Sequence, residues 1–447
     1  MSHEPRAMNQ TMRIAFATVG CRLNQCETDA LRGKAQVALY EVVPFDAVAD
    51  VYVINTCTIT SEADADSRQL VRRAIRRNPA ALVAVTGCYA QSTPEAVSAI
   101  PGVDLVLGNR EKVDLLTHLR AVRKNGGPRV RVGAGDAPRL LDGEDYGPAI
   151  DPDRTRALVK VQDGCNYTCS FCIVPAVRGD NRSLSPELVL REVRRLFAAG
   201  FPEVVLTGIH LGTYGRDLRP PASLVELCRR LVSQPDGPRV RLSSLDPHEV
   251  TPELIRLLRE SSRLCRHVHL PLQSGDEATL RRMRRGHTAA QFRSLVETLA
   301  VEVPGVAVSG DVIVGFPGED DRAFQRTYDL LTGLPIAGLH VFSYSPRPGT
   351  DAAGFPDQVP KSVKQERSRA LRGLAVRKAT AFRRQFLGEA LEVVVLQRDG
   401  KGAGLLEGLS DNFLRIWFEG ETRWQGRMGR VRVDQVTGRG LLGTLLA

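Results

Sequence analysis

Three cysteines stand close together near the middle of the chain, in the segment GCNYTCSFC. Cys165, Cys169 and Cys172 are separated by three and then by two residues. Thiolates are the ligands that iron–sulfur clusters prefer, and three of them bind three irons of a [4Fe–4S] cube and leave the fourth iron open. A zinc site or a structural cluster would need a fourth ligand, for which His210 is a candidate only if the fold delivers it. The spacing therefore predicts a cluster with an open iron, rather than three cysteines packed on one helix face at i, i+4 and i+7.

Three more cysteines each follow an apolar run in the first part of the chain. The runs RIAFATVG, VADVYVINTC and ALVAVTGC lead to Cys21, Cys57 and Cys88 and alternate with helical patterns. This order predicts a parallel α/β domain over residues 12–120, and such sheets bind ligands at the carboxyl ends of their strands. A lone buried cysteine usually packs as a small hydrophobe, but three at strand ends can converge at one edge. The other cysteines are assigned no chemistry; they are Cys26, Cys228 and Cys265.

A second series of strands and helices follows a stretch without periodicity. Residues 121–152 are rich in Gly, Pro and Asp, which is typical of a linker. Residues 153–360 contain six apolar runs, which are RALVKVQ, FPEVVLTG, RVRLSS, HVHLPL, AVSGDVIVG and GLHVFSYS. With helical patterns between them, these runs predict a full or partial (β/α) barrel whose active site lies at the strand C-termini. The loop that carries Cys165 follows the first of these strands.

Positive charge is concentrated in one segment near the end of the chain. The whole sequence has 61 Lys and Arg against 51 Asp and Glu, a net charge of +10, which favours a polyanionic partner. Residues 361–384 contain nine Lys or Arg and one Glu in an amphipathic pattern, and predict a basic connecting helix. A further basic cluster consists of Arg281, Arg282, Arg284 and Arg285. These residues supply the charge that an RNA would need, although a solvated basic face explains the helix equally well.

Short β-like runs separated by glycine-containing turns make up residues 385–447. They predict a small five-strand barrel. Eight Lys or Arg and eight Asp or Glu leave this segment neutral. If this segment binds RNA, it must use local basic patches or base stacking. The candidates for stacking are Phe413, Trp417 and Trp424, and we expect at least one of them to pack in the core instead.

Composition indicates a globular cytoplasmic protein. The chain has 447 residues, of which 43% are hydrophobic and 25% charged. No stretch approaches the ~18 apolar residues of a membrane span, and the first residues lack the apolar core of a signal peptide. Nine clustered cysteines in so long a chain suit reduced metal ligands better than a disulfide scaffold. We expect a monomer that does not bind a membrane.

The pattern C-x3-C-x2-C with an aromatic residue before the last cysteine resembles the signature of the radical S-adenosylmethionine enzymes. The resemblance implies that the open iron binds the methionine end of S-adenosylmethionine, and that reductive cleavage then gives a 5′-deoxyadenosyl radical that abstracts hydrogen. It also implies that Phe171 lies against the adenine and that an electron donor is needed.

From Met12 to the end, the chain resembles one branch of that superfamily, the methylthiotransferases. The matching segments are GCRLNQCET, ADVYVINTCTIT, VTGCYAQ, VQDGCNYTCSFCIVPAVRG, LTGIHLGTYG, HLPLQSG, DVIVGFPGE and FSYSPRPGT. The resemblance implies an amino-terminal α/β domain, a radical-SAM partial (β/α)6 barrel and a carboxyl-terminal TRAM-like β-barrel that binds RNA. It further implies that Cys21, Cys57 and Cys88 hold a second [4Fe–4S] cluster that binds or supplies the sulfur, and that a sulfur source is a partner.

Several polar residues at later strand ends are similar to family positions that line the cofactor cleft. The glycine-rich turn after the second strand contains Gly208 and His210 and matches the superfamily loosely. Ser243 in RLSSLDP, Gln273 in LPLQSG and Asp311 in SGDVIVG are the others. For each of these residues, strand-end capping or a turn is an equally good explanation.

The family is known to act on three substrates, which are two hypermodified adenosines beside the tRNA anticodon and an aspartate of a ribosomal protein. The segments GCRLN, INTCTIT, CYAQ, TGIHLG and LHVFSYSPRPGT look most like the branch that acts on N6-threonylcarbamoyladenosine. The resemblance then implies that a radical takes hydrogen from C2 of the adenine and that a methylthio group is transferred there. The alternatives are isopentenyladenosine in tRNA, a ribosomal-protein aspartate, and a non-catalytic RNA-binding iron–sulfur protein.

Overall fold

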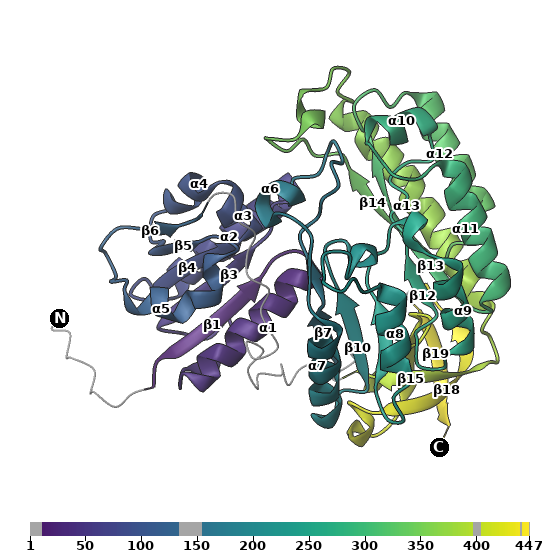
Figure 1. Cartoon of the computed structure of the whole chain (residues 1–447), viewed down its shortest axis with the longest axis horizontal. Helices are drawn as coiled ribbons and strands as arrows, with labels where there is room; N and C mark the ends of the chain where they lie inside the picture. The colour runs from purple at the N-terminus through teal and green to yellow at the C-terminus, as the bar shows by residue number, and fades with distance from the viewer. Residues whose placement is uncertain (1–10, 134–153, 397–403, 439, 447) are drawn as a thin grey trace. The chain divides into compact units, whose positions relative to one another are not determined.

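The computed structural model describes residues 11–133, 154–396, 404–438 and 440–446 (Figure 1). These residues form two compact units. The first contains residues 11–133, 164–166 and 173–180, and the second contains the rest of the described chain. Each unit is built around its own parallel β-structure.

The first unit contains a six-stranded parallel sheet. In spatial order its strands are β2 (Glu41–Val43), β1 (Arg13–Thr18), β3 (Val51–Thr56), β4 (Leu82–Gly87), β5 (Leu105–Leu107) and β6 (Arg129–Arg131). Ile14 lies opposite Val51, and Val53 lies opposite Ala84. The order 2-1-3-4-5 is that of a doubly wound sheet, which binds ligands where the direction of winding reverses, between β1 and β3.

Helices cover both faces of this sheet because its strands are apolar on both sides. The helices are α1 (Arg22–Val37), α2 (Ser61–Arg77), α3 (Cys88–Ser92), α4 (Pro94–Ser98), η1 (Glu111–Asp114), α5 (Leu115–Arg120) and α6 (Val174–Arg178). Alternate strand residues divide between the two cores: Ile14 and Val53 pack with Leu31 of α1, whereas Ile54 and Val85 belong to the other core. Figure 1 shows α1 running alongside β1.

The sequence predicted the strands β1, β3 and β4 but not β2, β5 or β6. The three missed strands have three residues each, too few to show a pattern. Strand β6 lies inside the expected linker 121–152 and pairs with β5. Residues 134–152 of that linker lie outside the described residues.

The second unit contains all six strands that the sequence predicted for its barrel. In spatial order they are β7 (Arg156–Lys160), β10 (Glu203–Thr207), β11 (Arg239–Leu242), β12 (His267–His269), β13 (Ala307–Val314) and β14 (Gly338–Ser343). All pairs within the two groups of three strands are parallel. Two single bridges, Val240 to Leu264 and Ser244 to His269, connect the groups. A two-residue pair, β8 (Gln162–Asp163) with β9 (Arg182–Ser183), follows β7.

Each strand of this partial barrel is followed by helical structure. The helices are α7 (Pro186–Ala198), α8 (Leu224–Val232), α9 (Pro252–Glu260), α10 (Glu277–Arg282), α11 (Ala289–Glu302), α12 (Asp321–Gly333) and α13 (Lys361–Arg384), with short turns η3 (Leu211–Thr213), η4 (Pro247–Glu249) and η5 (Asp351–Gly354). Six of them begin after a polar side chain that accepts a bond from the backbone N–H three residues on, which fixes where each helix starts. These caps are Ser185, Ser223, Thr251, Asp276, Thr288 and Asp320.

The carboxyl-terminal residues form the predicted five-stranded closed barrel. In order around the barrel its strands are β15 (Ala390–Val395), β16 (Leu405–Ser410), β17 (Arg415–Glu419), β19 (Leu441–Leu446) and β18 (Met428–Val436), with η6 (Thr422–Trp424) before β18. The fold class predicted from the sequence is thus confirmed: a parallel α/β unit, a partial (β/α) barrel and a small β-barrel.

The small barrel docks on the amino-terminal ends of β10 and β11 through buried charges. Arg239 donates to the Leu409 carbonyl at 3.0 Å, and Arg241 donates to the Ser410 carbonyl at 2.9 Å. Both guanidiniums also bind the fully buried Glu203. Burial opposes ionisation of this carboxyl, but the two arginines outweigh it and hold the pKa of Glu203 far below its usual value.

Two expectations about RNA contacts change at this point. Phe413 does not face outward for stacking with RNA, because its ring lies 4.6 Å from that of His267 and 5.1 Å from the guanidinium of Arg241. The basic helix α13 packs against β14, and Arg367 on it is buried against Glu319. Part of the positive charge of α13 therefore serves the interior.

Candidate active site with two cysteine sets

The first cysteine set, Cys21, Cys57 and Cys88, converges at the carboxyl edge of β1, β3 and β4. Cys57 follows β3 directly, and Cys88 follows β4 and opens α3. The three thiols interact electrostatically with one another in every pairing. A Cβ on Gly20, the residue before Cys21, would lie 2.5 Å from the Cys57 Cβ and 2.7 Å from its Sγ. The three cysteines of the first set therefore meet at the carboxyl edge of the sheet, as the sequence predicted.

Glycines make this convergence possible. Gly20 has φ +100° and Gly87 has φ +97°, a backbone region that is costly for any residue with a Cβ. At Gly87 a Cβ would also lie 2.4 Å from the Thr56 carbonyl. Cys21 and Cys88 can therefore turn toward Cys57 only with glycine before them, whereas Cys57 follows Thr56 directly at the end of β3.

The donor chemistry of the first set fits an iron–sulfur cluster. All three cysteines are free thiols, and Cys57 and Cys88 are buried. Burial, reinforced by the neighbouring thiols of Cys88 and Cys21, raises the pKa of the Cys57 thiol to about 12. Such a thiol is not a free nucleophile at neutral pH, and it becomes a thiolate only when a metal displaces its proton.

A buried cation stands beside this set. Arg178, 1% exposed, donates to Glu27 at 2.9 Å and to Asn24 at 2.6 Å. Its charge favours the thiolate forms of Cys21 and Cys57. A [4Fe–4S]²⁺ core held by these three thiolates would carry one net negative charge, which the neighbouring guanidinium would stabilise.

The second set, Cys165, Cys169 and Cys172, lies in the loop after β8, and none of the three is buried. The Cys165 N–H donates to the Gly179 carbonyl at 3.0 Å, and the Cys172 N–H donates to the Cys169 carbonyl at 3.1 Å. Gly164 has φ +70°, and a Cβ there would lie 1.9 Å from the Asp180 carbonyl oxygen. Three accessible thiols on a tightly turned loop suit a cluster that must admit a small molecule.

Arg285 is the side chain that the structure adds to this loop. Its Nη1 lies 3.4 Å from the Cys169 Sγ, and its Nη2 pairs with the buried carboxylate of Asp246. Next to Cys169, Ser170 Oγ donates to the Arg282 carbonyl at 2.7 Å. The loop is therefore tied to the segment that follows α10. Hydrogen bonds to the sulfurs are one of the ways in which proteins set the potential of a cluster.

Tyr167 holds the same loop from another side. Its ring meets that of His210 edge-on at 4.2 Å, and its hydroxyl lies 2.8 Å from His248 Nε2. His210 is buried, and its Nε2 lies 3.0 Å from Glu249 and 3.3 Å from Asp246. The predicted residue His210 thus lies beside the cysteine loop, paired with carboxylates.

The other predicted cofactor residues have different surroundings. Phe171 meets the ring of Phe316 edge-on, with centroids 6.4 Å apart. At Gly208 a Cβ would lie 2.6 Å from Gln162 Oε1, so only glycine leaves room for the Gln162 side chain there. The same Oε1 accepts a hydrogen bond from the His210 N–H. Ser243 is 8% exposed, and its hydroxyl has no hydrogen-bond partner among the described residues. A buried polar group of that kind is available to a ligand.

Gln273 and Asp311 lie on neighbouring backbone segments. Gln273 has φ +67°, its N–H donates to the Asp311 carbonyl and its own carbonyl accepts from Ile313, each at 2.9 Å. The Asp311 carboxylate lies between His269 and His340, at 3.1 Å and 3.2 Å. That these two residues contact the cofactor stays a prediction.

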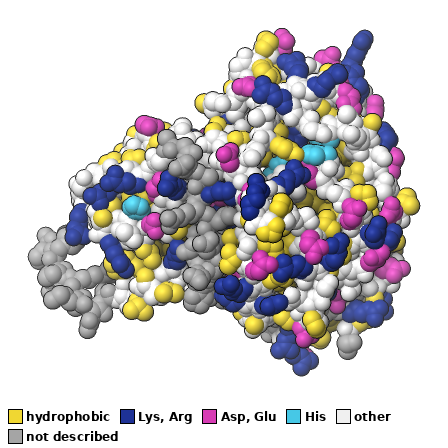
Figure 2. Space-filling model, in the orientation of Figure 1, with side chains coloured by type: hydrophobic (Ala, Val, Ile, Leu, Met, Phe, Trp, Pro, Cys, Tyr) yellow, Lys and Arg dark blue, Asp and Glu magenta, His cyan; other side chains and the backbone are white. Residues whose placement is uncertain are grey.

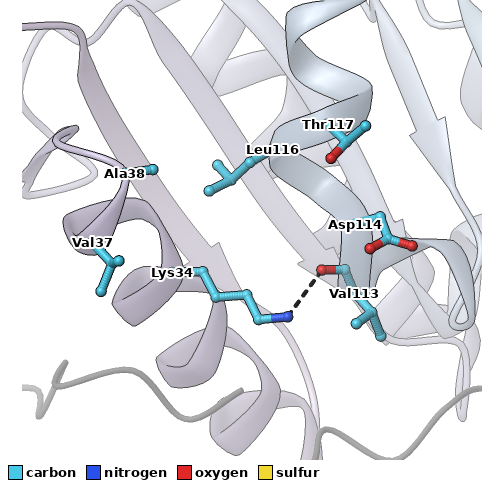
Figure 3. Close-up of a pocket in the computed structure, with 7 residues that line it drawn as sticks. All are labelled: Lys34, Val37, Ala38, Val113, Asp114, Leu116 and Thr117. Carbon is cyan, nitrogen blue, oxygen red and sulfur yellow. Dashed lines mark hydrogen bonds between the residues drawn. The ribbon is translucent and has the colours of Figure 1, made fainter. Parts of the chain in front are cut away.

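A pocket elsewhere in the first unit has no part in either set. Figure 3 shows it between α1 and the α5 segment, with Lys34 donating to the Val113 carbonyl at 3.2 Å. Its lining is Lys34, Val37, Ala38, Val113, Asp114, Leu116 and Thr117. It contains no cysteine and no residue that the sequence had singled out.

Sequence reasoning missed the charged residues that support the two sets. Arg178 lies six positions after Cys172 but pairs with Glu27, 151 residues away. Arg285 belonged to a basic cluster expected to face phosphate, and instead it contacts Cys169. No signal in the sequence singled out Glu27, because α1 carries charged residues along its length and nothing marks which of them is buried.

Comparisons with known proteins agree with this geometry. Residues 159–331 match the Radical SAM superfamily, and residues 13–108 match the Uncharacterized protein family UPF0004. The threonylcarbamoyladenosine tRNA methylthiotransferase MtaB of Bacillus subtilis is 40% identical over 94% of this chain and 93% of its own length. That of Aquifex aeolicus is 38% identical over 92% and 97%. The chain belongs to the radical S-adenosylmethionine methylthiotransferase family.

The fold has relatives among solved structures as well. The radical S-adenosylmethionine methyltransferase TsrM from Kitasatospora setae, with cobalamin and a [4Fe-4S] cluster bound, superposes with a TM-score of 0.54. It is 18% identical and is covered over 77% of each chain, a likeness that concerns the fold alone.

Membership of the methylthiotransferase family makes the protein an enzyme that uses S-adenosylmethionine and [4Fe–4S] clusters. The alternative of a non-catalytic RNA-binding protein is therefore wrong. Among the described residues, no helix is both long and apolar enough to span a membrane.

Proposed function

We propose that this enzyme converts N6-threonylcarbamoyladenosine in tRNA to its 2-methylthio derivative. The observation that carries the proposal is the identity of two relatives named for threonylcarbamoyladenosine, at 40% and 38%. Three further relatives with that name are 34%, 33% and 34% identical. Relatives named tRNA-2-methylthio-N(6)-dimethylallyladenosine synthase, from Moorella thermoacetica, Protochlamydia amoebophila and a Parafrankia species, are 33%, 32% and 35% identical.

In this proposal the two cysteine sets hold two different clusters. Cys165, Cys169 and Cys172 hold the cluster that binds S-adenosylmethionine, and Cys21, Cys57 and Cys88 hold the cluster that carries the sulfur. The cluster on Cys165, Cys169 and Cys172, with its S-adenosylmethionine, supplies the radical that activates C2 of the adenine. The chain's own part is to position the groups: Tyr167 and Arg285 hold the radical loop, and Arg178 balances the charge at the sulfur-bearing set.

The tRNA would contact basic side chains of the second unit. Helix α13 offers exposed Lys361, Arg369 and Arg384. On the face shown in Figure 2, Lys and Arg are spread over the surface in many small groups rather than one block. Dispersed positive charges of this kind suit contacts with phosphates along an extended stretch of the tRNA backbone. Their contribution to tRNA affinity should fall with added salt. We place the domains at 12–120, 153–360 and 385–447, connected by the linker 121–152 and the helix 361–384.

The second candidate substrate is dimethylallyladenosine in tRNA, because relatives that match over nearly the whole chain are named for it. The two substrates differ in polarity: threonylcarbamoyl carries a carboxylate and a hydroxyl, whereas dimethylallyl is a hydrocarbon. The same chain is therefore expected to favour one strongly over the other.

The test is a nucleoside analysis of tRNA. The anaerobically reconstituted enzyme, with S-adenosylmethionine, sulfide and a reductant, is incubated with tRNA carrying each modified adenosine, and the digests are analysed by mass spectrometry. We expect 2-methylthio-N6-threonylcarbamoyladenosine only. In a deletion strain the same nucleoside should disappear, and its persistence at an unchanged level would refute the proposed substrate.

A further inference from the structure

Four exposed arginines lie along one edge of the first unit. Arg120 ends α5 and Arg123 follows this helix, whereas Arg129 and Arg131 are the first and last residues of β6. Strand β6 is the last strand of the sheet, and among the described residues no further strand pairs with it (Figure 1). Residues 115–133 contain five Lys or Arg and no Asp or Glu. We call Arg120, Arg123, Arg129 and Arg131 the edge arginines.

The strand register places the two arginines of β6 on the face that α5 covers. Arg129 pairs with Leu105 of β5, and Arg131 pairs with Leu107. Residues paired in register point to the same face of a sheet, and both leucines belong to the core that contains the apolar residues of α5. Arg129 also donates to the carbonyl of Ala121, directly after α5, at 2.9 Å. The edge arginines therefore come from two neighbouring elements on one face of the sheet.

The edge arginines have no ion pair with Asp or Glu within the described part of the chain. Lys124, which lies between them in the sequence, pairs with Asp104 at 2.8 Å. The exposed arginines of α2 have different surroundings, because Arg73 and Arg77 both pair with Asp46 and the first turn of that helix is acidic. The charge of the edge arginines is therefore available to an external anion.

Protection of the sheet edge explains only half of this group. Charged side chains on an edge strand discourage pairing with the strand of another molecule, and Arg129 and Arg131 are placed for that role. Arg120 and Arg123 lie on and after a helix, where there is no strand edge to protect. A guanidinium is a planar fork that binds phosphate through two hydrogen bonds, so four of them on one face suit a polyanion that carries several phosphates.

The carboxyl end of β6 and the first cysteine set belong to the same end of the sheet. Strands β4, β5 and β6 are parallel, and Cys88 directly follows β4. Gln91 in α3, the helix that Cys88 begins, donates to the Gly133 carbonyl at 3.2 Å, two residues beyond Arg131. A phosphate chain bound along β6 would therefore run toward the end of the sheet where Cys88 lies.

From this arrangement we propose that the edge arginines bind the phosphate backbone of tRNA; the inference rests on the proposed function. The first unit then holds the substrate as well as the first cysteine set. Phosphate contacts fix the position of a nucleic acid without reading its bases. The edge arginines therefore contribute to the affinity for any tRNA and not to the choice between two modified adenosines.

The experiment compares two variants of the anaerobically reconstituted full-length enzyme that each lose four positive charges from the first unit. In the edge variant, Arg120, Arg123, Arg129 and Arg131 are replaced by Gln. In the control variant, the four exposed arginines of α2 are replaced by Gln; they are Arg72, Arg73, Arg76 and Arg77. Filter binding gives the tRNA affinity of both variants and of the wild type at several salt concentrations, and iron content and thermal unfolding check the fold.

The edge variant should bind tRNA about tenfold more weakly at low salt, and the control variant should stay within about twofold of the wild type. Each neutralised phosphate contributes about 0.7–0.9 to the slope of log affinity against log salt concentration, so the slope of the edge variant should fall by about 3. KM for tRNA should rise in the same proportion as the affinity falls. If the edge variant loses iron, the double variant Arg120→Gln/Arg123→Gln takes its place, and its slope should fall by about 1.5.

The outcomes separate this inference from the proposed function. Unchanged tRNA affinity in the edge variant, or an equal loss in the control variant, overturns the inference and leaves the proposed function standing. An edge variant with unchanged tRNA affinity that is slower only with a protein electron donor, and not with dithionite, replaces RNA by an acidic protein as the partner. A wild type that binds tRNA through the edge arginines but forms no methylthio product refutes the proposed function alone.

Discussion

The two cysteine sets reach their sites in opposite ways. Cys21, Cys57 and Cys88 come from three strands of one sheet and meet because parallel strands end at one edge. Cys165, Cys169 and Cys172 come from a single loop and depend on side chains such as Arg285 and Tyr167 to hold it. In the first set Cys57 and Cys88 are buried and Cys21 is exposed, whereas all three cysteines of the second set are half-buried. A sheet edge can thus bury most of a site, whereas a single loop leaves all of its thiols partly open to solvent.

Removing each set of thiols should separate two steps of the reaction. Replacing Cys165, Cys169 and Cys172 by Ala should abolish both 5′-deoxyadenosine and product, because the radical is no longer formed. Replacing Cys21, Cys57 and Cys88 should preserve 5′-deoxyadenosine and abolish only the methylthio product. Each variant should retain about half of the wild-type iron. A variant without the first set that still methylthiolates would refute the two-cluster assignment.

The glycines before the first set should be nearly as important as its thiols. Gly87→Ala puts a Cβ 2.4 Å from the Thr56 carbonyl at φ +97°, and the strained backbone alone costs about 1–3 kcal/mol. We expect loss of about half the iron, with the spectrum of the radical-loop cluster retained.

Gly127→Ala is the matched control. Gly127 has φ +80° in the same unit, but a Cβ there would meet nothing within 4 Å. It should lose stability in thermal unfolding but keep its iron. Equal iron loss in both variants would show that general destabilisation, not the turn at Cys88, is responsible.

Arg178 should affect the first set through charge. Arg178→Met leaves Glu27 buried with one cationic partner fewer, and removing one side of a buried pair typically costs about 3–5 kcal/mol. The free energy of unfolding in denaturant should fall accordingly, and the first cluster should form more slowly. Glu27→Gln in the same background would take away the carboxylate that the buried Lys112 binds, and should lower the free energy of unfolding further. A recovery of stability would mean that the three side chains do not act as a unit.

Arg285 should have the smallest and most local effect. Arg285→Lys keeps the charge but loses the two-sided contact with Cys169 and Asp246, so the potential of the radical-loop cluster should shift and cofactor cleavage should slow by about tenfold. Arg281, an exposed residue of α10, is the control. Voltammetry of Arg285→Lys and of the control variant measures the potential of the radical-loop cluster. Equal potentials in both would mean that Arg285 does not act on this cluster.

The features that could be predicted from the sequence are those that depend on residues close together along the chain. The spacing of Cys165, Cys169 and Cys172 is local, and each of the six barrel strands is an apolar run long enough to recognise. The convergence of Cys21, Cys57 and Cys88 was also predictable, because parallel strands share an edge.

What the sequence did not reveal depends on partners far away along the chain. Nothing near Arg241 indicates that it binds Glu203 and a carbonyl 169 residues on. Phe413 resembles a stacking residue in sequence and is instead part of this docking contact. Pairings of this kind depend on the relative placement of whole elements, which periodicity does not encode.

The docking of the small barrel has a consequence for how the protein matures. Arg239 and Arg241, both on β11, bind Glu203 of the neighbouring strand, but their carbonyl acceptors lie only at Glu392 and residues 409–411 of the small barrel. During synthesis the partial barrel would emerge from the ribosome with these guanidiniums and Glu203 still exposed to water at its open end. The catalytic barrel therefore completes its packing only after the last strands have been made, and iron loading before that point would occur on an unfinished scaffold. We therefore expect a fragment that ends at α13 to be less stable than the whole chain, because it lacks these acceptors.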